Sequence, residues 1–144
     1  MDEYYEDVEV GATREFGAYE VTSEEIISFA EQYDPQPFHT DPESARNSMF
    51  GGLVASGWHT AAMTMRMLVD HYLSKSGAMG SPGLEGLRWT TPVRPGDVLS
   101  VETEVTGKET WDDQRGVVHT SLTTSNDDGE TVMTMDSLVL FPRE

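Results

Sequence analysis

One segment limits what this chain can fold into: residues 57–75 are predicted to form a long helix with apolar side chains on nearly every face. A helix on a protein surface carries a single apolar stripe, so a helix that is apolar on most sides belongs in the interior. At 1.5 Å per residue it would be about 27 Å long. Because strand-like segments follow it, we expect a sheet to wrap around it.

Five segments have the composition or the alternation that is typical of β-strands. They are residues 15–21, 86–93, 98–106, 116–125 and 131–141. The sequence Asn-Asp-Asp-Gly at residues 126–129 predicts a hairpin turn between the last two strands. The last strand is apolar on both faces, which predicts a partner beyond its own sheet face, such as another subunit.

The chain between the first strand and the long helix is expected to hold short helices. Thr22 to Glu25 is typical of a helix start, and that helix would run to about Tyr33. Pro35 and Pro37 then predict non-helical chain. Asp41 is expected to cap a second, short helix.

These elements predict an α+β protein with one domain over residues 1–144. About five antiparallel strands would wrap around one long central helix, with a loop at residues 77–83 leading into the later strands. This is the hotdog fold, and such a sheet leaves an edge that commonly pairs with a second copy.

Acidic residues dominate the composition, with 26 Asp and Glu against 9 Lys and Arg and a formal net charge of −17. Such a surface repels nucleic acids and anionic membranes, so we expect neither as a partner. Ordinary acidic solubility would account for the charge. Only Lys75 and Lys108 are lysines, however, and this scarcity favours a halophilic protein adapted to molar salt, where screening shortens to about 3 Å.

The sequence also limits the kinds of reactive group the protein can use and the cell compartment in which we expect it. It has no cysteine, which excludes disulfides and thiolate nucleophiles. No apolar run approaches the roughly 20 residues that a membrane span needs. The acidic start of the chain is not typical of a signal or transit peptide, so we expect a cytoplasmic protein.

The segment Asp34-Pro35-Gln36-Pro37-Phe38-His39 is the first candidate for chemistry. It places a carboxylate and an imidazole five residues apart in a loop stiffened by two prolines. If the loop doubles back, both groups reach one water molecule, and such a pair suits general acid–base catalysis, typically worth roughly 10²–10⁴ in rate. The alternative is a helix end and a turn in which His39 caps a backbone group.

Ser56 and Gly57 are the second candidate, because they open the long helix. The first amides of a helix lack intrahelical partners and carry the positive end of its dipole. Glycine lets a ligand approach the backbone, so the Gly57 N–H could hold a carbonyl oxygen on which negative charge develops. The alternative is that Ser56 is a simple cap and Gly57 a packing choice.

Together these segments resemble the MaoC-like dehydratases, which include the (R)-specific enoyl-CoA hydratases. The motifs that carry the resemblance are Asp34-x-Gln36-Pro37-x-His39-x-Asp41, Gly52-Leu53-Val54-Ala55-Ser56-Gly57, Gly86-Leu87-Arg88-Trp89 and Pro92-Val93-Arg94-Pro95-Gly96-Asp97. The resemblance implies a hotdog enzyme that adds water to a trans-2-enoyl-CoA thioester to give the (R)-3-hydroxyacyl-CoA, or runs the reverse. It also implies a homodimer or higher homo-oligomer that needs no metal or redox cofactor.

The resemblance assigns Asp34 and His39 as the catalytic pair, with the Gly57 N–H on the thioester oxygen. Burial beside an apolar acyl tunnel is expected to raise the pKa of Asp34 and make it a better base. Expected substrate-binding residues are Ser56, Trp58, Arg88 and Arg94, with Arg46 as a further candidate for the CoA phosphates. Surface ion pairs are the alternative for the arginines.

Three positions depart from the family's usual pattern. Gln36 stands where asparagine is usual, Ser56 where histidine is common, and Met65 where characterised hydratases carry a helix serine. Two other functions therefore remain open at this stage, a hotdog acyl-CoA thioesterase and a non-catalytic acyl-CoA-binding module.

Overall fold

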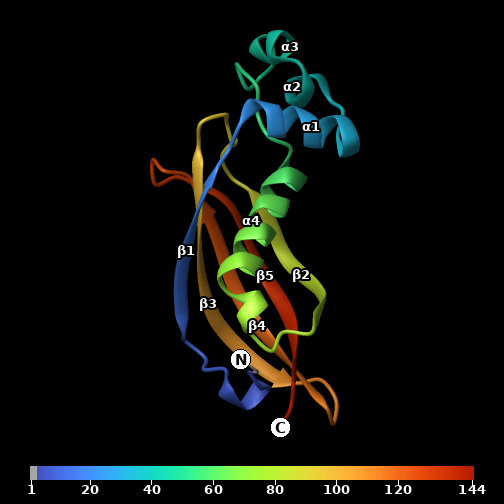
Figure 1. Cartoon of the computed structure of the whole chain (residues 1–144), viewed down its shortest axis with the longest axis vertical. Helices are drawn as coiled ribbons and strands as arrows, with labels where there is room; N and C mark the ends of the chain where they lie inside the picture. Colours follow the sequence, from blue (N-terminus) through green and yellow to red (C-terminus); the bar gives the residue numbers. More distant parts are fainter. Residues whose placement is uncertain (1–2) are drawn as a thin grey trace.

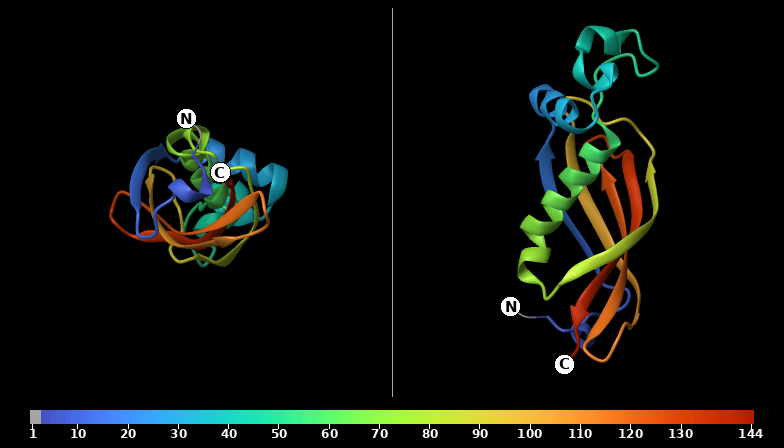
Figure 2. Two further views of the ribbon diagram at one scale, coloured as in Figure 1. Left: turned by 90° about the horizontal axis from the view of Figure 1, so that it is seen from below. Right: turned by 90° about the vertical axis from the view of Figure 1, so that its right-hand side faces the viewer.

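A long helix lies along a curved five-stranded antiparallel sheet in the computed structural model, which describes residues 3–144 (Figure 1). The helix is α4 (Gly57–His71), and the strands run in the order β1-β3-β4-β5-β2 across the sheet. Their bounds are β1 (Thr13–Glu20), β2 (Gly80–Trp89), β3 (Val98–Thr110), β4 (Arg115–Ser125) and β5 (Thr131–Pro142). Seen along the molecule, the strands curve around α4 (Figure 2), which confirms the predicted hotdog fold.

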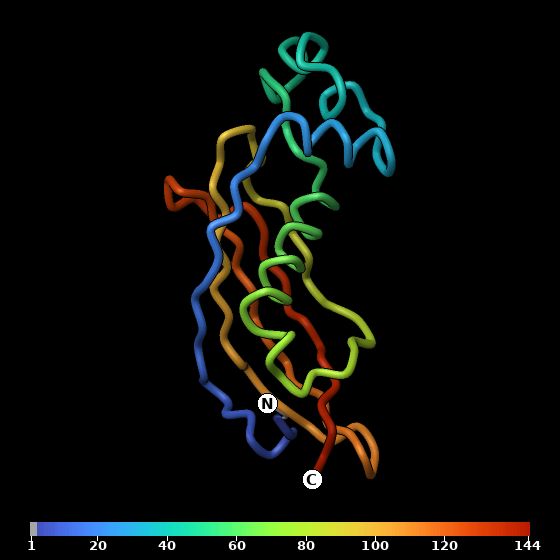
Figure 3. The backbone as a smooth tube through the Cα atoms, in the orientation of Figure 1, coloured from blue at the N-terminus to red at the C-terminus, as the bar shows by residue number. Residues whose placement is uncertain are grey.

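Three short helices gather at one end of the molecule, beyond the first turn of α4 (Figure 1). They are α1 (Ser23–Tyr33), α2 (Pro37–Thr40) and α3 (Pro42–Arg46). The chain leaves β1, passes through these helices and returns into α4 (Figure 3), while the C-terminus lies at the opposite end. Two 3₁₀ turns, Tyr5–Asp7 and Leu73–Lys75, complete the helical elements. Within the described part of the chain, no helix is long and apolar enough to cross a bilayer.

One face of α4 forms the centre of the core. Met63 and Met67 are buried against side chains of the sheet, among them Leu99, Leu122 and Met133. Each fully buried side chain of this size contributes about 1.5–3 kcal/mol through removal from water. A buried hydrogen bond between the hydroxyls of Thr64 and Thr124, 2.8 Å apart, adds a polar link from α4 to β4.

The prediction that α4 is buried on nearly every face is wrong for its outer side. Trp58, Met65 and Val69 are 60%, 50% and 40% exposed. The sheet of a single chain curves around only part of the helix, so this apolar outer face stays in contact with water.

Two further sequence predictions need correction. Pro37 does not end helical structure but begins α2, because proline is tolerated in the first helical turn and the preceding Gln36 is extended. Strand β2 begins at Gly80, so the predicted loop at residues 77–83 is partly strand. Its backbone pairs with β5, with Gly80 opposite Leu140, although Ser-Pro-Gly at residues 81–83 shows no strand alternation.

Gly17 shows how closely β1 approaches the central helix. It has a φ of +94°, and it lies between Phe16 and Tyr19, where the β1–β3 register shifts. A Cβ added there would lie 2.5 Å from Met67 Sδ. Both the backbone conformation and the packing therefore require glycine.

We expect Gly17→Ala to lower the free energy of unfolding by about 1–3 kcal/mol more than Gly11→Ala does. Gly11 is the matched control, because its φ is +93° and a Cβ there meets nothing within 4 Å. The difference between the two variants isolates the clash with Met67. Urea denaturation measures it, and equal losses in the two variants would contradict the expected clash.

Candidate active site

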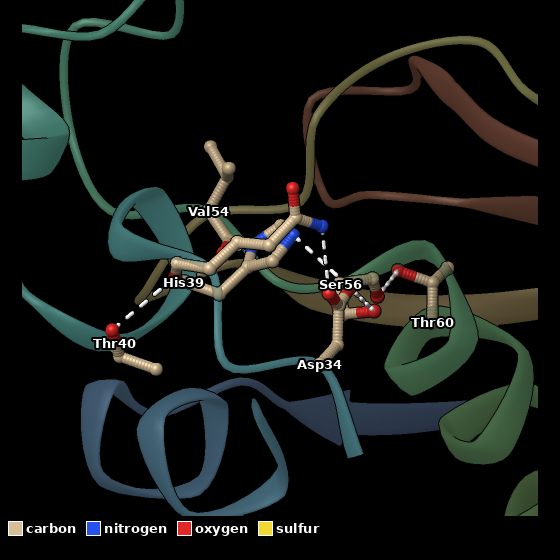
Figure 4. Close-up of polar contacts among 7 residues, drawn as sticks. Asp34, His39, Thr40, Val54, Ser56 and Thr60 are labelled. Atoms are coloured by element: carbon tan, nitrogen blue, oxygen red, sulfur yellow. Dashed lines mark hydrogen bonds and ion pairs between the residues drawn. The ribbon is translucent and has the colours of Figure 1, made fainter. Parts of the chain in front are cut away.

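The Asp34 carboxylate lies where α1 ends and α4 begins. Asp34 follows the last residue of α1 and bonds through its backbone N–H to the Ala30 carbonyl. Ser56 immediately precedes α4, and its Oγ donates to Asp34 Oδ2 at 2.7 Å (Figure 4). The Ser56 hydroxyl makes no capping bond to α4. The alternative reading of Ser56 as a simple helix cap is therefore wrong. Its hydroxyl instead bonds Asp34, 22 positions earlier in the chain.

His39 faces the same carboxylate from α2. Its Nδ1 lies 2.7 Å from the Val54 carbonyl oxygen, which can only accept, so Nδ1 carries the hydrogen. In the neutral ring Nε2 then presents a lone pair, and it lies 3.4 Å from Asp34 Oδ2 (Figure 4). Two hydrogen-bond acceptors thus face each other, and a donor from outside the pair, or protonation of His39, is needed to join them.

Helix α2, which carries His39, is held in place by backbone hydrogen bonds. The Val54 N–H donates to the Phe38 carbonyl at 3.2 Å, and the Ala55 N–H donates to the Val93 carbonyl at 2.8 Å. The chain just before α4 therefore anchors α2 on one side and the turn after β2 on the other. His39 is only 6% exposed as a result.

The Asp34 pKa corrects the expectation drawn from burial. Burial does raise it, but the Ser56 hydroxyl, the Gln36 amide and the nearby His39 together outweigh that effect, and the pKa lies below its ordinary value. Gln36 Nε2 donates to Asp34 Oδ1 at 2.6 Å, so each carboxylate oxygen has a donor. Asp34 is therefore ionised at neutral pH, and Gln36, which the sequence marked only as a departure, helps to position it.

An apolar cavity of about 430 Å³ opens beside this pair. His39, Gly57 and Thr60 line it, whereas Asp34, whose side chain is 19% exposed, touches His39 without lining the cavity. The remaining walls come largely from Phe38, Phe50, Trp89, Pro92 and Val93. The cavity thus brings apolar walls, one imidazole and the start of α4 together.

Trp89 at the end of β2 explains why residue 57 is glycine. A Cβ added at Gly57 would lie 2.5 Å from the Trp89 indole. The ring therefore packs directly on the first residue of α4. Trp89 stands out in the sequence only as part of a motif, and no local pattern indicates its contact with Gly57.

The structure brings Asp34, His39, Ser56 and Gly57 together, and two of them, His39 and Gly57, line the cavity. The other predicted site residues lie outside this group and do not line the cavity. Trp58 is exposed and meets the Trp89 ring edge-on, 5.2 Å between centroids.

Of the arginines, Arg88 is exposed on β2, while Arg94 donates to the Phe50 carbonyl at 2.7 Å and so supports a cavity wall. Arg46 Nε lies 3.5 Å from the Pro42 carbonyl oxygen, within its own short helix α3. None of the three lines the cavity.

Within residues 3–144 no three His, Asp or Glu side chains are grouped so that they could hold a metal ion.

Residues 7–127 match the family model of the MaoC like domain, and the chain belongs to this family. A MaoC-like dehydratase from Rhodospirillum rubrum has a similar solved structure, with a TM-score of 0.88 and 42% identity over 98% of this chain and 97% of that one. The 3-hydroxybutyryl-CoA dehydratase of Methylorubrum extorquens is 35% identical over 71% of this chain and 63% of its own length. An R-hydratase from Pseudomonas aeruginosa is 27% identical, with a TM-score of 0.74 over 98% of this chain and 86% of that one.

We expect Ser56→Ala to raise the pKa of Asp34, because it removes a donor that stabilises the carboxylate. The folded-state pKa lies below the ordinary 3.8, so ionised Asp34 stabilises the fold above that pH and this contribution is lost as the pH falls through the folded value. The variant loses part of that contribution at neutral pH. Carboxyl ¹³C NMR against pH measures the pKa.

Ser44→Ala is the matched control, because the Ser44 hydroxyl donates to the exposed Asp41 carboxylate at 2.8 Å. It should leave the Asp34 titration unchanged. An Asp34 pKa that is the same in wild type and Ser56→Ala would contradict the role assigned to the Ser56 bond.

Proposed function

We propose that this protein adds water to the double bond of a trans-2-enoyl-CoA thioester to give the (R)-3-hydroxyacyl-CoA, or removes water in the reverse direction. The observation that carries the proposal is the geometry of Asp34 Oδ2 and His39 Nε2, which lie 3.4 Å apart while the Val54 carbonyl holds the other ring nitrogen of His39. A water molecule has two hydrogens, so it can donate one to each and leave its own lone pairs free. Membership of the MaoC-like dehydratase family supports the same chemistry.

In the hydration direction, Asp34 accepts one proton from the bound water as the water oxygen bonds to the β-carbon. The electron pair of the double bond moves to the α-carbon and the thioester carbonyl. The Gly57 N–H, at the positive end of α4, stabilises the charge on that oxygen. His39 orients the water through Nε2 and helps to move the proton that Asp34 accepted to the α-carbon. Asp34 returns to the carboxylate, and one water molecule is added overall.

The low pKa of Asp34 makes it a weak base before substrate binds. The apolar cavity provides a way to strengthen it. An acyl group that fills the cavity excludes bulk water from His39, which lines the cavity and borders Asp34. The surroundings of the carboxylate then become less polar, and such desolvation raises the pKa of an acid. In this scheme substrate binding and activation of the base are the same event.

The substrate also has to bring several phosphate charges to an acidic chain. Arg94 supports the cavity wall through Phe50, and Arg88 lies next to Trp89 on the edge strand β2, on the opposite face of that strand. Both cations are exposed. They are therefore the side chains that we assign to the CoA phosphates, with the Trp58–Trp89 pair beside the thioester.

We further propose that the working unit is a homodimer or a higher homo-oligomer. Strand β2 is a sheet edge, and nearly all of its residues are exposed. An exposed edge with apolar side chains such as Leu84 and Trp89 favours pairing with another strand. The exposed outer face of α4, with Met65 and Val69, would be covered in the same assembly.

Charge and substrate suggest the setting in which the enzyme works. A net charge of −17 with two lysines supports a halophilic protein, because self-repulsion weakens when salt screens it. Enoyl-CoA thioesters are intracellular metabolites, so the proposed reaction favours a cytoplasmic location.

We expect the protein to consume the enoyl-thioester absorbance of crotonyl-CoA, faster in molar KCl than in dilute buffer, and to form the (R)-alcohol. Asp34→Asn and His39→Gln should each lower kcat by roughly 10²–10⁴, the usual size of general acid–base catalysis. Asp41→Asn is the matched control, since Asp41 is an exposed carboxylate that caps α3 and should leave kcat unchanged.

Three experimental outcomes would contradict the proposed hydratase function. Release of free CoA thiol without hydration would indicate a thioesterase. Tight binding without turnover, unaffected by His39→Ala, would indicate a binding module. A wild-type protein that is inert toward short, medium and branched enoyl-CoAs would reject the hydratase.

We expect the wild-type protein to sediment as at least a dimer in analytical ultracentrifugation, and Val69→Glu to shift it toward the monomer. The change places a charge on the outer face of α4, which the proposed assembly would cover. Val10→Glu is the control, because Val10 is 57% exposed and lies before β1, outside α4. Wild-type protein that sediments as a monomer at all concentrations would contradict the assembly.

A further inference from the structure

A second polar cluster lies on the other side of the first turns of α4, and the proposed chemistry does not use it. It consists of Tyr19 from β1, Glu25 from α1 and His59 from α4. The Tyr19 hydroxyl donates to Glu25 Oε1, and His59 Nε2 lies 3.4 Å from the same oxygen. These residues line a cavity of about 340 Å³ that shares no lining residue with the cavity beside His39.

The surroundings of His59 restrict it to one protonation state. Glu25 Oε1 accepts, so Nε2 carries the hydrogen and Nδ1 presents a lone pair. Among the described residues, Nδ1 is the one buried side-chain nitrogen or oxygen atom with no hydrogen-bond partner. Protonation would place a second N–H there without an acceptor, which is costly in the interior.

Neighbouring charges do not reverse this preference. His59 is 3% exposed, and burial lowers its pKa while the hydrogen bond and charge of Glu25 only partly offset that effect. Tyr19 is neutral, because burial and Glu25 raise its pKa to about 12. The Arg66 cation also lines the cavity and opposes a second positive charge. Phe29 of α1 stacks on the imidazole, 4.7 Å between centroids and 10° between planes.

The cluster joins the two helices on which the Asp34 geometry depends. Glu25 and Phe29 lie on α1, which ends one residue before Asp34. His59 is the third residue of α4, in the turn that begins with Gly57. The 2.7 Å bond from Ser56 to Asp34 crosses the same junction between α1 and α4. Any shift of α1 along α4 therefore changes both contacts together.

We infer that His59 is a positioning residue, whose neutral imidazole holds α1 against α4 through Glu25 and Phe29 and thereby sets the distance between Asp34 and the first turn of α4. The consequence for turnover rests on the proposed hydratase function. The consequence for the Asp34 environment does not, because it follows from the junction alone.

The test compares His59→Leu, which keeps the bulk and loses the donor, with His59→Gln, whose side-chain amide can donate to Glu25. We expect His59→Leu to lower kcat for crotonyl-CoA roughly 10-fold to 100-fold with KM little changed, because small misplacements of reacting groups cost that much. The same variant should raise the pKa of Asp34, read by carboxyl ¹³C NMR, because the Ser56 bond is loosened. His59→Gln should restore most of both properties.

The pH dependence of the free energy of unfolding distinguishes two roles of His59, that of an ionisable imidazole and that of a side chain that only fills space. The His59 pKa is lowered in the folded state, so the unfolded chain binds the proton first and wild-type stability falls as the pH drops below 6.5. His59→Gln should remove this part of the fall. His119→Leu is the matched control, because His119 pairs with Glu109 at 3.0 Å on the far part of the sheet, and it should change neither kcat nor the Asp34 pKa.

Glu25 provides a second arm if His59→Leu does not fold. Its side chain is 42% exposed, so Glu25→Ala leaves no core cavity, and we expect it to reproduce the effect of His59→Leu. Glu25→Gln keeps the acceptor oxygen and should resemble wild type, as should Glu24→Ala on the same turn.

The outcomes distinguish this inference from the proposed function. Folded His59→Leu or Glu25→Ala protein with wild-type kcat and wild-type Asp34 pKa would overturn it, as would a His59→Gln variant that behaves no better than His59→Leu. A wild-type protein with no hydratase activity would reject the proposed function. In that case the Asp34 pKa in the variants would still decide whether His59 positions the junction.

Discussion

Burial of α4 against the curved sheet is the constraint on which the rest of the structure depends. Met63 and Met67 fill the space between the helix and the strands, and Gly17 lets β1 approach the helix closely. Because α4 begins near one end of the sheet, its first turn faces α1–α3 (Figure 1). Asp34 and His39 come from this short segment, so the packing of one helix determines where the polar groups can meet.

Polar groups at this junction are positioned by pairwise hydrogen bonds rather than by burial alone. Ser56 and Gln36 each donate to one oxygen of Asp34, and the Val54 carbonyl orients the His39 ring. These donors stabilise the carboxylate so well that the pKa of Asp34 is low although the group is largely enclosed. In this arrangement His39 Nε2 lies 3.4 Å from the ionised Asp34 Oδ2. A water molecule beside the two atoms can donate one hydrogen bond to each.

The sequence predicts those elements that have strong local signals and fails where long-range pairing decides. The alternation in β3 and the turn at residues 126–129 are local, so these strands and their hairpin are predicted, although β3 continues to Thr110, beyond its predicted end at residue 106. The start of β2 is missed because residues 81–83 are strand only through their pairing with β5. The interpretation of Pro37 as a helix breaker is wrong because position decides: at the first residue of α2 its ring fits the helix.

What the sequence determined by itself was the long central helix, the order of strands along the chain and the presence of an acid, an imidazole and a glycine in linked motifs, because periodicity and turn chemistry are local properties. Only the tertiary structure decided that Ser56 bonds Asp34 rather than capping α4, that Trp89 covers Gly57, and that His59 joins a separate cluster with Glu25. Those contacts link residues 22, 32 and 34 positions apart in the chain, and their geometry depends on how helices and strands pack, which no local pattern encodes.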